Sequence, residues 1–195
     1  MTRARRRVRS WKRVSSRPLS DHRIFVLRQD VSVSPKTGRE HPFVVLESGD
    51  WVNVIPITRA GNVVMIEQFR HGVRAPTLEI PGGLVDPGET PRAAALRELR
   101  EETGYGGGRV EALGWAHPNP AIQDNRVWTF VVRGVTKLGD AHTEATEDIA
   151  VFEVPLARVP AMLRNGEITH AAVIVAFAKL FGAGPATSSR RRRRG

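Results

Sequence analysis

The stretch GGLVDPGETPRAAALRELREETGY, residues 82–105, decides how this chain folds and gathers three carboxylates into one short segment. It opens with two glycines and a turn. Thr90 then offers a good helix N-cap, and Pro91 suits the first helical turn. Alanines and leucines repeat at helical spacing as far as Thr103, and Gly104 suits a helix end. We therefore expect a helix over residues 90–103.

Glu98, Glu101 and Glu102 stand at i, i+3 and i+4, so a helix brings all three to one face within a single turn. Arg97 can pair with Glu101, but it cannot neutralise three carboxylates. A solvated, salt-bridged face is one interpretation of this pattern. The other interpretation is a binding site for a divalent cation. Mg²⁺ and Mn²⁺ prefer hard carboxylate oxygens and keep coordination positions open for water and phosphate.

The spacing of glycines and charged residues over the whole of residues 83–105 carries more information than the helix alone. It resembles the Nudix box, the signature of the Nudix hydrolases, through the residues Gly83, Glu89, Arg97, Glu98, Glu101, Glu102 and Gly104. The last position of the box is usually aliphatic and is Tyr105 here. The resemblance implies an α/β fold, the Nudix α/β/α sandwich with a mixed sheet, here with a small N-terminal β-rich segment. It also implies hydrolysis of a nucleoside diphosphate linked to another moiety.

The same resemblance assigns roles within the box. Glu98 and Glu102 would be the main metal ligands, with help from Glu101 and from the carbonyl of Gly82. The structural positions would be Gly83, Glu89, Arg97 and Gly104, with Arg97 and Glu89 orienting the helix and the loop. The implied cofactor is Mg²⁺, with Mn²⁺ as a substitute.

Segments outside the box narrow the subgroup. IEQFRHGVRAPTLEIPGG (residues 66–83) and the later NGEITHAAVIVAFAKL resemble segments of ADP-ribose and nucleotide-sugar pyrophosphatases. Pro120 lies where these carry a proline, fifteen residues after Tyr105. The expected reaction is Mg²⁺-dependent hydrolysis of ADP-ribose or a related nucleoside diphosphate sugar to a nucleoside monophosphate and a sugar phosphate. GDP-mannose, ADP-glucose, dinucleoside polyphosphates and capped RNA remain alternative substrates. A non-catalytic protein that binds nucleotides or nucleic acid is the alternative of a different class.

Substrate contacts are expected from four residues. By resemblance Arg70 contacts phosphates, with a surface arginine at a strand end as the alternative. Glu79 either helps to hold the site or is a structural partner of Arg70. Trp51 either stacks on a base or is buried. Pro120 belongs to the expected substrate loop. For the catalytic base the acidic loop HTEATED offers Glu147 first and Glu144 second, with Glu101 as a further catalytic candidate.

Composition limits the remaining possibilities. The chain of 195 residues has no cysteine, which excludes disulfides and fits a cytoplasmic location. The net charge of +10 comes from the ends, where residues 1–13 and 190–194 hold twelve of the 30 basic residues. Such runs are typical of disordered segments that either have no dedicated partner or bind nucleic acid or anionic surfaces weakly. No apolar run reaches the length of a membrane span.

The expected organisation has four parts: a basic flexible arm (1–20), a β-rich dimerisation segment (21–56), the Nudix hydrolase domain (57–182) and a disordered Arg-rich tail (183–195). The resemblance implies a homodimer whose N-terminal segments are exchanged between subunits and help to form the pocket for a nucleoside diphosphate sugar.

Overall fold

The structure is a computed structural model that describes residues 8–142 and 148–182. Its contacts divide the chain into two compact units, one of Met1–Gly49 with His117–Asn125 and one of Asp50–Ala116 with Arg126–Gly195. Glu144 and Glu147, the expected bases, and most of the basic ends lie outside the described residues. Nucleic-acid contact through those ends and the cytoplasmic location both stay predictions.

The larger unit is built on one eight-stranded sheet with the path β11-β5-β4-β10-β8, to which β6 adds beside β5, β7 beside β4 and β9 beside β10. β4 and β10 run parallel, whereas the other pairs are antiparallel, so the sheet is mixed. The strands are β4 (Trp51–Thr58), β5 (Asn62–Arg70), β6 (Ala75–Glu79), β7 (Gly82–Leu84), β8 (Tyr105–Gly106), β9 (Arg109–Ala116), β10 (Val127–Lys137) and β11 (Ile149–Pro155).

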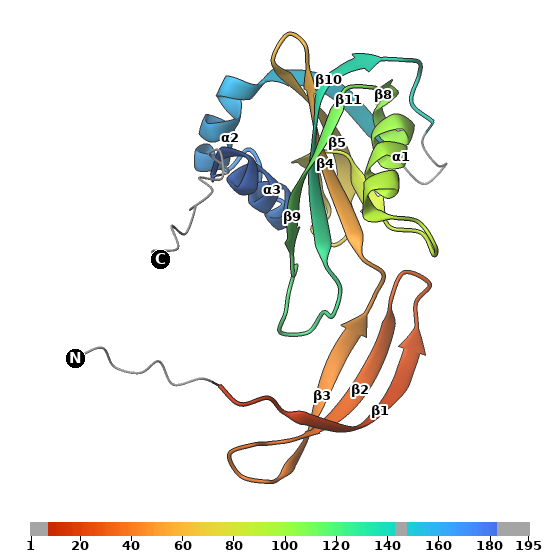
Figure 1. The fold of residues 1–195 in the computed structure, drawn as a ribbon, viewed down its shortest axis with the longest axis vertical. Coiled ribbons are helices and arrows are strands. Elements are labelled where there is room, and N and C mark those ends of the chain that lie inside the picture. Colours follow the sequence, from red (N-terminus) through yellow and green to blue (C-terminus); the bar gives the residue numbers. More distant parts are fainter. Residues whose placement is uncertain (1–7, 143–147, 183–195) are drawn as a thin grey trace, which may run out of the picture. The chain divides into compact units, whose positions relative to one another are not determined.

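Helices cover both faces of this sheet (Figure 1). On one face α1 (Pro91–Thr103) buries Ala94, Ala95 and Leu99 against strand residues such as Val52 and Val64. On the other face the 3₁₀ helix η1 (Leu156–Arg158), α2 (Val159–Asn165) and α3 (Ala171–Gly182) lie with the second apolar cluster. The two clusters confirm the expected α/β/α sandwich. They also explain why the central strands β4 and β10 are apolar on both sides.

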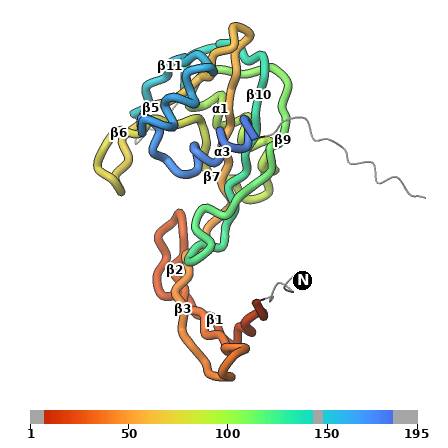
Figure 2. The backbone as a smooth tube through the Cα atoms, turned by 90° about the vertical axis from the view of Figure 1, so that its left-hand side faces the viewer, coloured from red at the N-terminus to blue at the C-terminus, as the bar shows by residue number. Residues whose placement is uncertain are grey.

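The hairpin of β5 and β6 leads directly into the glycine pair, because β6 ends at Glu79 and β7 begins at Gly82 (Figure 2). β6 pairs with the second half of β5, from Ile66 to Arg70. β7 then pairs with the beginning of β4, with Gly82 opposite Asn53. This route fixes the loop before α1 at one end of the central strand.

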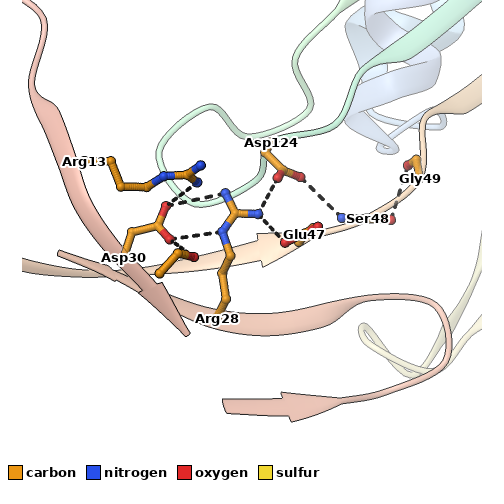
Figure 3. A network of polar contacts seen from close by, with 8 residues as sticks. Arg13, Arg28, Asp30, Glu47, Ser48, Gly49 and Asp124 are labelled. Carbon is orange, nitrogen blue, oxygen red and sulfur yellow. Dashed lines mark hydrogen bonds and ion pairs between the residues drawn. The ribbon is translucent and has the colours of Figure 1, made fainter. Parts of the chain in front are cut away.

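The smaller unit is a three-stranded antiparallel sheet of β1 (Lys12–Asp21), β2 (Val26–Val33) and β3 (Glu40–Glu47), in that order. The loop 117–125 belongs to this unit, although its sequence lies between β9 and β10. It is tied to β3 by a hydrogen bond of 2.7 Å from the Leu46 amide to the Ile122 carbonyl and by a bridge between Leu46 and Gln123. Arg28 adds ionic contacts to the same loop (Figure 3).

Two expected boundaries differ from the structure. Residues 12–20, expected within a flexible arm, form β1, because their backbone pairs with β2 and Ser16 donates a 2.6 Å hydrogen bond to Asp30. The N-terminal segment ends near Gly49 rather than at residue 56, because β4 is a buried central strand of the larger sheet.

The helix 90–103 is confirmed, with Thr90 as N-cap and α1 over Pro91–Thr103. Within the described ranges, no helix is long and apolar enough to cross a membrane.

Candidate active site

Local capping fixes the helix that carries the three carboxylates. The Thr90 hydroxyl accepts a 3.2 Å hydrogen bond from the Ala93 amide, which satisfies one of the free donors of the first turn. At the other end Gly104 is left-handed, with φ of 70°. A Cβ there would lie 2.2 Å from the carbonyl oxygen of Gly139, so only glycine fits. Both caps hold α1 in one register relative to the glycine loop.

The glycine pair brings the backbone against two of the carboxylates. A Cβ on Gly83 would lie 2.3 Å from Oε1 of Glu98, so the glutamate occupies the space that any side chain would fill. The Gly82 amide donates a 2.9 Å hydrogen bond to Oε2 of Glu102. Glu102 is only 4% exposed, although it is a charged residue. The helix and the loop are therefore joined at the two glutamates expected to be the main metal ligands.

Arg97 connects the loop to the helix through several bonds. Its Nε and Nη2 donate to the two oxygens of Glu89 at 3.2 and 3.0 Å, and Nη2 also donates to the carbonyl of Leu84 at 3.0 Å. Its Nη1 donates to Oε1 of Glu98 at 2.8 Å and to Oε2 of Glu101 at 3.0 Å. The hydrogen bonds from Arg97 hold the pKa of Glu89 below its usual value, against the opposing effect of burial.

The residues of this turn fit a hard divalent cation in chemical kind. Glu98, Glu101 and Glu102 supply carboxylate oxygens, and the glycine pair brings backbone to the same point without side chains in the way. Among the described residues, no three acidic or histidine side chains are already grouped as the ligands of one ion. Arg97 instead bridges Glu98 and Glu101, so a cation would compete with its Nη1 for those oxygens.

Arg70 and Glu79 form a second charged group on the strands that lead to the glycine loop. Nε and Nη2 of Arg70 each donate a 2.7 Å hydrogen bond to a different oxygen of Glu79. The Thr77 hydroxyl adds a bond of 2.6 Å, and Nε2 of His170 lies 3.8 Å from Oε2. Burial alone would raise the pKa of Glu79, but the bonds from Arg70 and Thr77 outweigh it and the pKa is lowered.

The structure places Glu79 as the buried partner of Arg70, with its side chain 4% exposed against 43% for the arginine. Val64 belongs to the apolar cluster under α1, and strand alternation puts Arg70 on the same side of β5. Both interpretations made from the sequence are therefore compatible: Glu79 orients Arg70, and Arg70 presents a guanidinium on the face of the sheet that carries α1.

The other two expected substrate residues belong to different units. Trp51 begins β4 and pairs with Leu84, and its indole Nε1 is buried without a hydrogen-bond partner among the described residues. Pro120 is exposed and lies in the N-terminal unit. Sequence reasoning missed Asn53, whose Oδ1 would be 2.8 Å from a Cβ on Gly82 and whose Nδ2 is also a buried donor without a partner in the described part of the chain. Its position opposite Gly82 needed the strand register.

Comparisons with known proteins give the family of the chain. The NUDIX domain model matches residues 48–177, which include α1, the glycine loop and the whole mixed sheet. The chain belongs to the Nudix hydrolase family. Its fold resembles a solved structure described as the crystal structure of ADP compounds hydrolase, with a TM-score of 0.78, 19% identity, and 91% of this chain and 95% of that chain covered.

Three curated relatives are similar in sequence. The ADP-ribose pyrophosphatase of Mycobacterium tuberculosis is 32% identical over 83% of this chain and 78% of its own length. The methanol dehydrogenase activator of Bacillus methanolicus is 32% identical over 64% of this chain and 68% of its own length. The mouse ADP-sugar pyrophosphatase is 46% identical over 45% of this chain and 43% of its own length.

Proposed function

We propose that this Nudix hydrolase cleaves the pyrophosphate of ADP-ribose or a related nucleoside diphosphate sugar, giving a nucleoside monophosphate and a sugar phosphate. The observation that carries the proposal is the join between α1 and the glycine loop, where Glu98 lies against Gly83 and Glu102 accepts from the Gly82 amide. Relatives described as ADP-ribose and ADP-sugar pyrophosphatases support this substrate class.

We further propose that Glu98 and Glu102, with Glu101 and the Gly82 carbonyl, hold Mg²⁺, for which Mn²⁺ can substitute. The bound cation would neutralise phosphate charge and lower the pKa of a coordinated water. Arg70 would contact the phosphates with a guanidinium that Glu79 holds in one orientation. Glu147 first, or Glu144 three residues before it, would accept the proton of the attacking water, with Glu101 as the candidate on α1.

The first experiment measures product release with Mg²⁺ from ADP-ribose, ADP-glucose, GDP-mannose, diadenosine tetraphosphate and capped RNA. Glu102→Gln keeps an oxygen for the Gly82 amide but removes the charge, so we expect near-complete loss of turnover with the fold retained. Glu111→Gln is the matched control, because Glu111 is an exposed carboxylate on β9. Tight nucleotide binding without turnover of any substrate would instead favour the non-catalytic alternative.

We also propose that the protein is a homodimer joined through the N-terminal sheet. The large apolar side chains that are exposed on that sheet and its N-terminal approach in the single chain include Trp11, Val14, Leu19, Phe43 and Val44. A second copy that covers them would remove apolar surface from water. Sedimentation equilibrium at micromolar concentration should give twice the chain mass. In the double variant Phe43→Ser/Val44→Ser the measured mass should shift towards that of the monomer. A monomeric wild type would contradict the proposal.

A further inference from the structure

The two end strands of the path through the large sheet are joined by a side-chain hydrogen bond. Tyr105 lies on β8 and Glu153 on β11, which stand at opposite ends of the path β11-β5-β4-β10-β8. The Tyr105 hydroxyl donates to Oε1 of Glu153 at 2.8 Å. In a flat sheet four strand spacings would put the two backbones about 19 Å apart, which is beyond the reach of a tyrosine and a glutamate. The sheet therefore curls until its two end strands meet.

A β-bulge bends β10 just before it pairs with β8. The pairing of β10 with β4 leaves Gly134 as an extra residue, with a left-handed φ of 83°. β8 pairs with β10 beyond this bulge, at Thr136 and Lys137. Tyr105 and Val151 of β11 both pack against the apolar cluster under α1. Because Tyr105 directly follows the residue that caps α1, the two end strands meet at the C-terminal end of this helix.

The segment that follows the bend in β10 wraps the end of α1. Nζ of Lys137 donates to the Thr103 carbonyl at 2.8 Å. The His142 amide donates to the Glu101 carbonyl at 2.7 Å. Both donors satisfy carbonyls that a helix end leaves without partners. One of these carbonyls belongs to Glu101, so the wrapping reaches the turn of α1 that carries the expected metal ligands.

Tyr105 and Glu153 are each held by further contacts. The Tyr105 amide donates to Oγ1 of Thr103 at 3.1 Å, and Nζ of Lys137 lies 5.3 Å from the centroid of the tyrosine ring. Burial and the bond to Glu153 both raise the pKa of Tyr105, so its hydroxyl stays protonated and donates at neutral pH. Oε2 of Glu153 accepts from Nδ2 of Asn62 at 2.9 Å. The bond therefore joins two side chains that other contacts already place.

The two parts that this bond joins are both prone to local opening. Among the described strands β11 pairs with β5 alone, so it has one hydrogen-bonded neighbour, whereas the central strands have two. The last turn of α1 is a helix end, and helix ends open more easily than helix centres. A bond between them restrains both. An aliphatic side chain at position 105, which is usual in the Nudix box, could pack on the cluster under α1 but could not form this bond.

We propose that Tyr105 is a positioning residue that couples the metal-binding turn of α1 to β11 through Glu153. This inference rests on the proposed function, because it takes the metal to bind at Glu98 and Glu102. Fixing these carboxylates with a cation also orders the last turn of α1, and the bond from Tyr105 extends that order to β11. Such coupling is reciprocal, so loosening β11 must in turn weaken metal binding.

The direct test is amide exchange of β11 with and without Mg²⁺, so that it is independent of turnover. Without metal, Tyr105→Phe should speed exchange of residues 149–155 about 5-fold. With saturating Mg²⁺, wild type should gain protection in α1 and in β11, whereas Tyr105→Phe should gain it in α1 alone. The affinity for Mn²⁺, measured by electron paramagnetic resonance, should fall about 5-fold in the variant.

Variants of Glu153 test the same bond from its other end. Glu153→Gln keeps an acceptor oxygen and should behave like wild type, whereas Glu153→Leu should match Tyr105→Phe. The double variant Tyr105→Phe/Glu153→Leu should lose no more than either single variant, because both remove one bond. Glu111→Leu is the matched control, since Glu111 is an exposed carboxylate on β9, and it should leave β11 exchange unchanged.

Equal β11 exchange in Tyr105→Phe and wild type would overturn the proposal. So would a gain of β11 protection on adding Mg²⁺ that is as large in Tyr105→Phe as in wild type. A wild type that binds no Mn²⁺ would overturn the proposed metal site and the coupling with it. The exchange of β11 without metal would then still show whether Tyr105 holds this strand, so the two failures are distinguishable.

Discussion

Arg28 and Asp124, 96 positions apart in the sequence, are joined by a 2.7 Å hydrogen bond from Nη1 to Oδ2. The same nitrogen donates to Glu47 at 2.6 Å, and Nε donates to Asp30 at 3.2 Å (Figure 3). Asp124 in turn accepts from the Ser48 amide at 3.3 Å. One arginine of β2 therefore holds the loop that carries Pro120 against the end of β3.

Replacing Arg28 should release that loop. Arg28→Met leaves Asp30, Glu47 and Asp124 close together, and the exposed Arg13 pairs with Asp30 alone among the three in the described part of the chain. Its side chain is 13% exposed, so the loss of this partner should lower the free energy of loop opening by about 2–3 kcal/mol. Amide exchange of Ile122, Asp124 and Leu46 should become faster by a corresponding factor.

The matched control for this loop is Arg17→Met. Arg17 lies on the neighbouring strand β1 and donates to Gln29 in an exposed pair, so its removal should leave the exchange of residues 117–125 unchanged. Equal protection of the loop in Arg28→Met and wild type would show that the backbone bonds of Leu46 are sufficient to hold it.

The sequence predicted the parts of the fold that depend on local spacing. The helix caps at Thr90 and Gly104 and the face shared by Glu98 and Glu102 follow from neighbours along the chain. Contacts that depend on register could not be predicted. Trp115 faces α1 only because of the bulge at Leu113, and residues 12–20 form a strand through pairing with β2 rather than through an apolar pattern of their own.

The two glycines of the loop should respond differently to a methyl group. In Gly83→Ala the new Cβ meets the movable carboxylate of Glu98, so the fold should survive while Glu98 is displaced. In Gly82→Ala it would lie 2.2 Å from the Val52 carbonyl oxygen, which is backbone and cannot swing away. We expect Gly83→Ala to lose at least about 10-fold in activity with little change in Tm.

We expect Gly82→Ala to lower Tm clearly, because β7 must move away from β4. Thermal unfolding and turnover of the proposed substrate, measured on both variants, separate the two effects. Similar Tm losses in both would mean that Glu98 is as rigid as the backbone of β4.

Arg97→Lys should weaken metal binding although the charge is kept. A lysine ammonium cannot reproduce the bonds that Arg97 donates to Glu89 and to the Leu84 carbonyl together. Because these bonds hold the glycine loop in place beside the helix, affinity for Mn²⁺ should fall about 10- to 100-fold. Electron paramagnetic resonance of free Mn²⁺ measures this without substrate. Arg92→Lys is the control, since Arg92 is an exposed arginine on the first turn of the same helix.

The lowered pKa of Glu79 predicts how stability depends on pH. A carboxyl whose folded pKa lies below its usual value of 4.5 adds stability above that pH, and the contribution is lost as pH falls through the folded pKa. Glu79→Gln removes this titration and leaves Arg70 without its ionic partner. The difference in unfolding free energy between wild type and variant should be constant above pH 5 and should shrink below about pH 4.

Denaturant unfolding across pH 3–7 measures the difference, and Glu111→Gln, which changes an exposed carboxylate, should show no such trend. A difference that grows as the pH falls would mean that burial, rather than Arg70 and Thr77, controls the pKa of Glu79.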